Sequence, residues 1–388
     1  MKPAWRSAML RFSLGPSELV AICPASSRDR LDVFVLTREG LLRGVDLERG
    51  HVFFTAQLDF MPTAPGAEGG ITLAASDDGL FVAATQTHGL RGALFDVARQ
   101  TRLRELVRED YHADVSAWTL AFLRHRGQLV LVSSAEWNRL EALAVPSLEP
   151  LVPAEATLNY FFGSASLSPS GAWLASSGWA WHPLGMVRII DVAAWLDGRP
   201  ADPPEREGLG LTAEWWDDDL CWLSDDRLVV RGEAQPDADH ASLYFEKCDG
   251  LVVIDFAASR VERVIPCDAR RLATDGRFVF SWGSRVDVYE PGTGALVTSR
   301  DGAVHEWLPG ARAFISFDQG RAHAHWLSGT HAGVVTLPAS AIAPDAHALA
   351  VLGDSLEAAG ADPALVEHCR AAHPHGERCW VLEALRAG

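Results

Sequence analysis

The chain has 388 residues, of which 48% are hydrophobic, so it is long enough to bury a large core. Its formal net charge is -17, from 51 acidic and 34 basic residues, and it has no run of lysine or arginine, which argues against binding to nucleic acid or anionic membranes. No apolar run reaches the length of a transmembrane helix, and residues 1–15 lack the apolar core and cleavage site of a signal peptide.

Short strands separated by turns begin near residue 18 and recur along the chain. The first group has three expected strands, at 31–37, 41–47 and 52–57. The second group is clearer and has four expected strands, at 71–75, 80–85, 92–97 and 102–107. Four short strands are the content of one blade of a β-propeller.

The same pattern continues through the middle of the chain. A third blade is expected at about 118–152, with its clearest strand at 128–133. The fourth follows the turn SPSG and has strands at 172–175 and 186–192. A fifth begins near residue 214, with strands at 228–231 and 251–256 on either side of a long polar stretch.

Two further groups complete the series. The sixth is compact, with strands at 271–273, 277–282, 285–289 and 295–299. The seventh is expected to use 304–308, 313–317, 322–326 and 333–337. We therefore predict an all-β fold, a seven-bladed β-propeller that spans residues 1–338.

An acidic residue recurs near the end of the third strand of a blade. It stands in GVDL, LFDV, IIDV and VIDF, as Asp46, Asp96, Asp191 and Asp255, and Glu290 lies nearby in the sixth blade. A carboxylate at this place can accept hydrogen bonds from the amides of the turn before the outer strand. We interpret these acids as structural groups and not as catalytic ones.

The segments SPSGAWLAS, SDDGLFVAA and TDGRFVFSW, each followed by a strand and an acid-containing turn, resemble the WD40-like family of seven-bladed propellers. Blades of that family often end in Trp-Asp and carry a Gly-His pair, and neither recurs in register here. SSGWAWHPLGMV and DDDLCWLSDDRLVV look like segments of uncharacterised bacterial members. The resemblance implies a propeller that serves protein interaction, and it implies no assigned activity.

After residue 338 the pattern changes to that of short helices. Leu349, Leu352 and Leu356 recur at helical spacing, and Asp362 followed by Pro363 is typical of a helix start. We predict a C-terminal helical module at 339–388, which resembles a short module at the C-terminus of many bacterial proteins and implies no established role. A piece of this size would struggle to fold alone, so we expect it to dock on the propeller or on another protein.

This expected module contains one cluster of possible zinc ligands, namely His368, Cys369, His373, His375 and Cys379. The cluster lacks a paired Cys-x-x-Cys. The alternative, which we favour, is that Cys369 packs between helices and the histidines lie on a loop. A separate group of acids, Glu214, Asp217, Asp218 and Asp219, lacks the spacing of a calcium loop and is interpreted as part of a solvated loop. We predict no cofactor.

No catalytic motif is present, since neither Gly-x-Ser-x-Gly nor Gly-x-x-x-x-Gly-Lys occurs. The six cysteines are scattered, unlike those of a disulfide scaffold, so we expect reduced thiols and a cytoplasmic location. We predict a non-enzymatic scaffold or adaptor that binds another protein, and no catalytic residue is proposed.

The candidate partner-binding residues are aromatic side chains flanked by acids, in two stretches: Trp179, Trp181 and His182, and then Trp215, Trp216 and Asp217. We expect the first three to lie on a loop, which Pro183 stiffens, and a stiff loop suits an anchor because it loses little entropy on binding. The alternative, that the Trp179 and Trp181 rings wedge between neighbouring blades, remains equally open.

The second functional class is an enzyme or a small-ligand-binding protein that uses the central funnel of the propeller. Candidate residues for that funnel are His88, His182, Asp217, His323 and His325. A pocket that gathers several of them would favour this class, and a funnel filled by apolar side chains would count against it.

Overall fold

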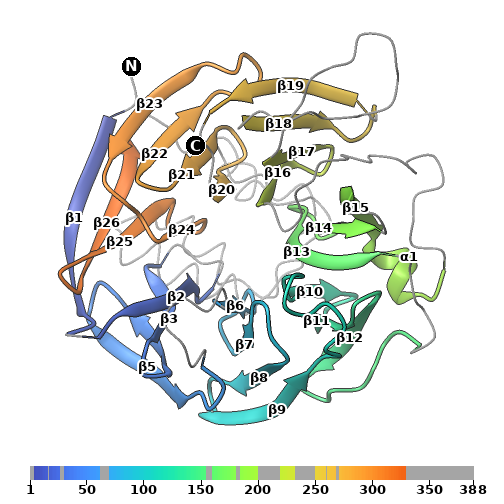
Figure 1. Ribbon diagram of the computed structural model, residues 1–388. Helices are drawn as coiled ribbons and strands as arrows, with labels where there is room; N and C mark the ends of the chain where they lie inside the picture. The colour runs from blue at the N-terminus through green and yellow to red at the C-terminus, as the bar shows by residue number, and fades with distance from the viewer. Residues whose placement is uncertain are drawn as a thin grey trace, which may run out of the picture. The chain divides into compact units, whose positions relative to one another are not determined.

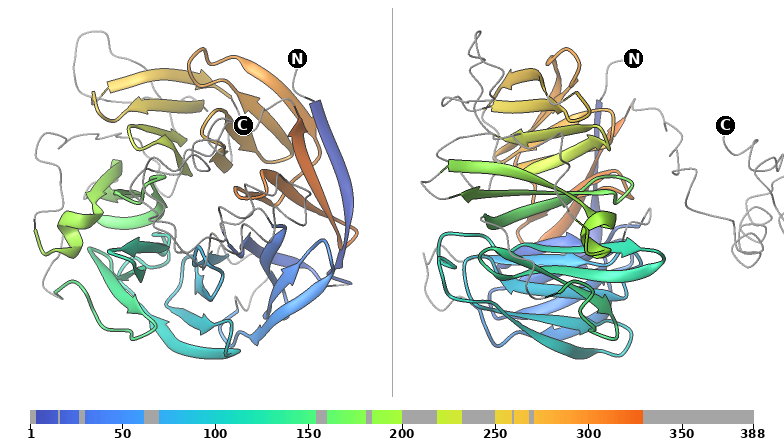
Figure 2. Two further views of the ribbon diagram at one scale, coloured as in Figure 1. Left: turned by 180° about the vertical axis from the view of Figure 1, so that it is seen from behind. Right: turned by 90° about the vertical axis from the view of Figure 1, so that its right-hand side faces the viewer.

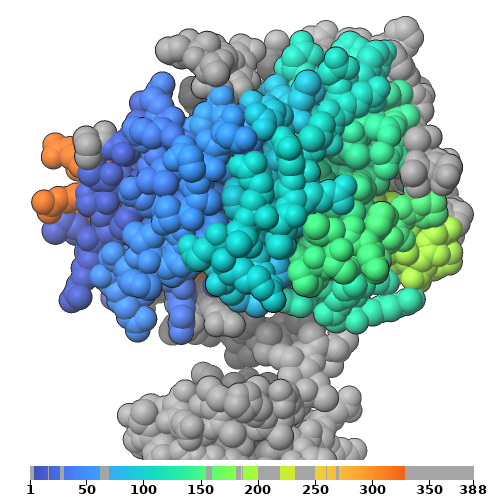
Figure 3. All heavy atoms as spheres, turned by 90° about the horizontal axis from the view of Figure 1, so that it is seen from below, coloured from blue at the N-terminus to red at the C-terminus, as the bar shows by residue number. Residues whose placement is uncertain are grey.

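The protein is represented by a computed structural model, which describes residues 4–15, 17–26, 30–61, 70–153, 160–180, 184–199, 219–231, 250–258, 260–267 and 271–328. The described strands form seven antiparallel sheets, arranged as blades around a central axis (Figure 1). A space-filling view shows blades 1 to 4 following one another around the rim in chain order, from blue to green (Figure 3). The prediction of a seven-bladed β-propeller is therefore confirmed.

Four blades consist of four consecutive strands, with the innermost strand first. Blade 1 contains β2 (Leu19–Pro24), β3 (Asp32–Thr37), β4 (Leu41–Asp46) and β5 (His51–Gln57). Blade 2 contains β6 (Ile71–Ala75), β7 (Phe81–Gln86), β8 (Arg91–Asp96) and β9 (Thr101–Val107). Blade 5 contains β16 (Leu220–Ser224), β17 (Arg227–Arg231), β18 (Gly250–Asp255) and β19 (Arg260–Pro266). Blade 6 contains β20 (Arg271–Thr274), β21 (Val279–Trp282), β22 (Arg285–Tyr289) and β23 (Leu296–Asp301).

Blades 3 and 4 have three described strands each. They are β10 (Leu120–His125), β11 (Gln128–Glu136) and β12 (Arg139–Val145) in blade 3, and β13 (Phe161–Leu167), β14 (Trp173–Ala180) and β15 (Leu184–Asp191) in blade 4. Helix α1 (Val192–Leu196) lies at the outer edge of blade 4 (Figure 1). It begins there because Asp191 is its N-cap, accepting a hydrogen bond from Ala194 N at 2.8 Å.

Blade 7 joins the two ends of the propeller sequence. It contains β24 (Glu306–Leu308), β25 (Ala313–Asp318), β26 (Arg321–Ser328) and, as its outer strand, β1 (Ala4–Ser13). The pairing of β1 with β26 runs from Ala4 opposite Ser328 to Ser13 opposite Arg321, and Figure 2 shows the two strands side by side. The expectation that 333–337 supplies this strand is wrong, because β25 and β1 occupy both edges of β26. Residues 333–337 themselves lie outside the described part.

The core of the described propeller consists of seven hydrophobic clusters, each between two neighbouring blades. Strand β3 shows why the clusters form between blades. Successive side chains of a strand point to opposite faces, so Phe34 and Leu36 pack toward blade 2 while Val33 and Val35 pack toward blade 7. All four are fully buried. A blade with both faces buried needs apolar residues at consecutive positions, which explains the continuous apolar runs of the sequence.

The recurring acids at the ends of the third strands are structural, as predicted. Each carboxylate accepts a hydrogen bond from a backbone amide of the following turn, three residues on. The bonds are Arg49 N to Asp46 at 2.9 Å, Arg99 N to Asp96 at 2.8 Å, Ala194 N to Asp191 at 2.8 Å, Ala258 N to Asp255 at 2.9 Å and Thr293 N to Glu290 at 2.6 Å. They satisfy amides that the sheet leaves unpaired.

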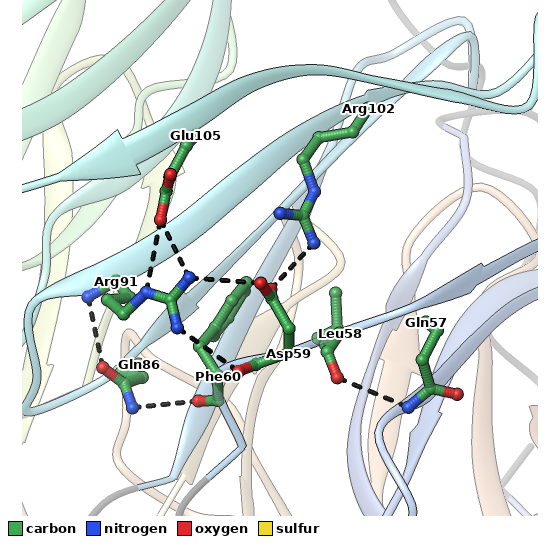
Figure 4. A network of polar contacts seen from close by, with 8 residues as sticks. All are labelled: Gln57, Leu58, Asp59, Phe60, Gln86, Arg91, Arg102 and Glu105. Carbon is green, nitrogen blue, oxygen red and sulfur yellow. Dashed lines mark hydrogen bonds and ion pairs between the residues drawn. The ribbon is translucent and has the colours of Figure 1, made fainter.

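A polar network holds the segment that leads from blade 1 to blade 2 (Figure 4). Arg91 contacts the carboxylates of Asp59 at 3.2 Å and Glu105 at 2.9 Å, and Arg102 bonds Asp59 at 2.8 Å. The Gln86 amide also donates to the Phe60 carbonyl at 2.9 Å. The Asp59, Arg91 and Glu105 side chains are about half exposed, so these pairs orient the segment and contribute little to stability.

The chain divides between Ser328 and Gly329 into two units. The second unit, Gly329–Gly388, lies wholly outside the described residues, so the helical module and its boundary at residue 339 stay predictions. In the described part of the chain, no helix has the length and apolar character needed to cross a membrane.

The closure of the ring by β1 predicts a sharp contrast between two side chains of this strand. Phe12 is 5% exposed, belongs to the cluster between blades 7 and 1, and lies edge-on to Phe317 with ring centroids 6.4 Å apart. We expect Phe12→Ala to lower the free energy of unfolding by about 3–5 kcal/mol. Met9 lies on the same strand but is 60% exposed, so Met9→Ala should change it by less than about 0.5 kcal/mol. Denaturant unfolding measures both, and similar losses in the two variants would contradict the described packing of β1.

Candidate functional site

Most of the residues that the sequence suggested for binding lie outside the described residues. This applies to Trp181, His182, Trp215, Trp216 and Asp217, and to the possible zinc ligands His368, Cys369, His373, His375 and Cys379. Their roles therefore stay predictions. Trp179 is the one partner-binding candidate that the structure describes.

Trp179 lies within β14 and not on a loop, because the strand extends to Ala180, which pairs with Leu184. Its indole is 9% exposed and stacks on Phe161 with ring centroids 3.7 Å apart and an interplanar angle of 5°. The indole N–H donates to Ser116 Oγ at 3.0 Å. Of the two roles considered for this residue, the geometry matches packing. The expectation that Trp179 lies on a loop is therefore wrong, and residues 181–183 lie outside the described part.

The Phe161 ring under Trp179 is part of a larger aromatic cluster. Trp137, from the β11–β12 turn, packs on Phe161 with ring centroids 4.3 Å apart. Tyr111 stacks on the same Phe161 ring with centroids 6.0 Å apart. The His112 ring contacts both Tyr111 and Trp179, with centroid distances of 4.5 Å and 5.6 Å. Tyr111 is 41% exposed, so the cluster runs from the interior to the surface near the end of β14.

A channel of about 740 Å³ runs along the axis of the propeller, bounded by the innermost strands of the blades. The side toward blades 1 to 4 is apolar or carries hydroxyl groups. It includes Ile22, Ile71, Leu73, Leu120, Thr72 and Ser164. The charged residues of the described lining, Asp219, Arg271 and Glu306, all come from blades 5 to 7. The channel wall is therefore amphipathic, with its charges on one side.

These three charges occupy equivalent places in successive blades. Asp219 precedes β16, Arg271 is the first residue of β20, and Glu306 is the first residue of β24. Each is followed by a buried side chain, Leu220, Leu272 or Trp307 in turn. Because adjacent blades repeat one another around the axis, a residue at this repeat position lies beside its counterparts in the channel wall.

Arg271 links the two acids. Its Nε lies 3.8 Å from Asp219 Oδ2, and its Nη2 lies 3.4 Å from Glu306 Oε2. The guanidinium also lies over the Trp282 ring, 5.3 Å from its centroid. Backbone amides fix both carboxylates, since Leu272 N donates to Asp219 at 3.0 Å and Trp307 N donates to Glu306 at 2.9 Å. The Glu306 side chain is 12% exposed and that of Asp219 34%.

Burial governs the protonation of these groups. It raises the pKa of the Asp219 carboxyl and outweighs the lowering by Arg271 and Arg231. Burial likewise raises the pKa of Glu306 in spite of Arg271. The Cys23 thiol, which also lines the channel, has its pKa raised first by burial and then by the Glu306 charge, so it is neutral. Among the described residues, the neighbouring cations therefore do not offset the burial of these two carboxyls.

His305 is the one described histidine in the channel lining. Burial, and then Arg271, lowers its pKa, so the ring is neutral at pH 7. Phe317 N donates to His305 Nδ1 at 3.2 Å, which leaves the proton on Nε2. The neutral ring can therefore donate a hydrogen bond but adds no charge.

The three described residues that were suggested for the funnel, His88, His323 and His325, do not line it. His323 and His325 lie on β26, the strand next to the outer edge of blade 7, and His88 lies in the β7–β8 turn outside the lining. His325 is buried, with its two nitrogens 2.7 Å from Ser7 Oγ and 2.8 Å from Ser316 Oγ, and burial lowers its pKa to about 4. The His325 ring therefore links β26 to β1 through Ser7 and to β25 through Ser316. His182 and Asp217 are outside the described residues.

Comparison of the sequence with models of known protein families found no match, and comparison with curated proteins found no similar protein. The geometry of the propeller itself therefore carries the functional argument.

The raised pKa of Glu306 predicts how a variant responds to pH. The pKa of Glu306 is higher in the folded protein than the ordinary value of 4.5, so folding favours the protonated carboxyl. The contribution of this group to the free energy of unfolding is therefore fully present below pH 4.5 and is lost as the pH rises through the pKa of the folded protein. Glu306→Gln carries no charge at any pH. We expect it to be more stable than the wild type at pH 8 and equal to it near pH 4, as measured by denaturant unfolding.

Glu290 provides a matched control of opposite sign. Hydrogen bonds from Thr293 and the Gly292 amide lower the pKa of its carboxyl, so its contribution is present above pH 4.5 and lost as the pH falls. Glu290→Gln should therefore be less stable than the wild type at pH 8 and approach it in acid. If Glu306→Gln behaved in the same way as Glu290→Gln, the described burial of Glu306 would be wrong.

Proposed function

We propose that this protein is a non-enzymatic interaction module that binds another protein through an acidic and aromatic surface loop, residues 109–116. The seven-bladed propeller is compatible with a scaffold role. The observation that carries the proposal is Tyr111, which is 41% exposed in a loop with three exposed acids, Glu109, Asp110 and Asp114. An exposed aromatic ring among carboxylates is a suitable anchor for a basic and apolar segment of a partner.

This loop is held rigidly from below. Arg108 is 8% exposed, and its guanidinium donates to the carbonyls of Gly89 at 2.6 Å, Ala113 at 2.7 Å and Ser116 at 2.9 Å. The same group lies over the Trp118 ring, 5.1 Å from its centroid. One buried cation thus ties the middle and the C-terminal end of the loop to the β7–β8 turn of blade 2. A loop fixed in this way loses little conformational entropy when a partner binds.

The loop also adjoins the stretch that the sequence first suggested. Tyr111 and His112 contact Phe161, and Phe161 stacks on Trp179 near the end of β14. Trp181 and His182 follow Trp179 in the chain. This continuity supports a binding surface that includes Tyr111 together with Trp181 and His182, and the partner-binding roles of Trp215, Trp216 and Asp217 remain part of the same proposal.

Relation to the WD40-like family belongs to this proposal as well, supported by the blade count and by the turn acids at the ends of the third strands. A cytoplasmic location is supported by Cys23 and Cys221, which are buried free thiols. One observation favours the second class, a small-ligand-binding protein, and that is the charged wall of the central channel.

Affinity purification from cells of the native host tests the proposal. We expect Tyr111→Ala to weaken capture of the partner by about 2 kcal/mol, roughly 30-fold, since it removes the anchor. Its melting temperature should change little, because the ring is largely at the surface. Leu296→Ala is the matched control: this side chain is 51% exposed on blade 6, and its loss should leave capture unchanged.

The double variant Asp110→Lys, Asp114→Lys tests the charge argument separately. A basic partner should be lost from this variant, and its binding to the wild type should weaken as salt is added. Recovery of the same proteins in the same amounts with Tyr111→Ala and with the double lysine variant would refute the proposed surface.

A further inference from the structure

The central channel presents a second feature that a protein-docking surface does not explain. Its volume of about 740 Å³ lies within the range of small-molecule sites, and its lining joins an apolar wall to a few converging polar groups. Blades 1 to 4 contribute one ionisable group to the described lining, the neutral Cys23 thiol. Blades 5 to 7 contribute Asp219, Arg271, His305 and Glu306.

The charges of the channel wall do not balance. In the described lining, two carboxyl groups face one guanidinium, and Arg271 reaches them only at 3.8 Å and 3.4 Å, longer than a strong charge-assisted bond. Arg231, which is outside that lining, also lowers the pKa of Asp219, but burial outweighs both arginines. His305 adds no positive charge, since its ring is neutral. A buried negative charge without a full partner is costly, so a positively charged ligand would gain from these acids.

Acceptor capacity remains on this side of the channel. Asp219 Oδ2 accepts from Leu272 N and Glu306 Oε1 accepts from Trp307 N, so backbone amides hold both carboxylates in place. A carboxylate has about four lone-pair sites, and the contacts made by the described residues leave several of them open. The two fixed carboxylates can hold one cationic head group, and the apolar wall opposite them can contact the hydrocarbon body of the same ligand.

We infer that the central channel is a binding site for a small organic cation, a primary amine or guanidine on an apolar body, with its charge held by Asp219 and Glu306. The site does not depend on the proposed interaction loop, which lies at the connection of blades 2 and 3. A divalent metal ion is a poorer fit, because the described residues bring together no group of three or more metal-ligating side chains.

Ligand-observed NMR with the full-length protein tests this assignment. The ligands are 2-phenylethylamine, isoamylamine and agmatine, each compared with a carboxylate of similar body, such as 3-phenylpropionate or 4-methylpentanoate. We expect at least one amine to bind with a Kd of about 1 mM or lower, and the carboxylates to bind at least about ten-fold more weakly.

Two conservative variants locate the site. Glu306→Gln and Asp219→Asn keep the size of each side chain and remove the charge, so each should weaken amine binding by at least about ten-fold. Glu105→Gln removes a carboxylate from β9, on the outer edge of blade 2, and should bind the amines as the wild type does. Thermal melts confirm that every variant is folded.

Three results would overturn the inference. They are carboxylates that bind as tightly as the amines, unchanged amine binding in both channel variants, and no amine binding to folded wild-type protein at millimolar concentration. None of them bears on the loop 109–116, whose variants are read out by partner capture. Failure of one site is therefore distinguishable from failure of the other.

Discussion

The packing of each blade against two neighbours is the constraint on which this structure depends. A single blade is a small sheet with two apolar faces, and water would contact both if the neighbours were removed. Val33 and Phe34, adjacent in β3, serve different interfaces. The ring is therefore stable only when it is complete, and completion falls to β1, which pairs with β26 from the opposite end of the propeller sequence.

Local pattern was sufficient to predict the blades and insufficient to predict their closure. The strands at 71–75 and 251–256 were recognisable because apolar runs and turn residues lie next to each other in sequence. Strand β1 is a different case. Five of its first seven residues, counted from Ala4, are exposed, and its partner strand is more than 300 residues away. Neither turn residues nor the spacing of apolar residues along the sequence can predict a pairing between such distant strands.

The charged wall of the central channel is not predictable from local pattern for a related reason. Asp219 was interpreted as part of a solvated acidic stretch, and Arg271 and Glu306 were treated as strand residues. What unites them is their shared place at the start of an inner strand, each before a buried Leu or Trp. Alignment of the blades on that apolar residue would have found them. The histidines chosen for the funnel were selected by residue type, and His325 instead lies buried between β1 and β25.

The register of β1 against β26 also decides how the ring responds to mechanical force. Ala4 lies opposite Ser328, so the two chain segments that leave this ladder do so at the same end. Tension applied between them would load the first backbone pair alone, then the next, and would peel β1 away step by step. The opposite arrangement, with the loaded ends at opposite ends of the ladder, would strain all pairs together. A propeller that unfolds cooperatively in denaturant would thus yield to pulling at one pair of strands.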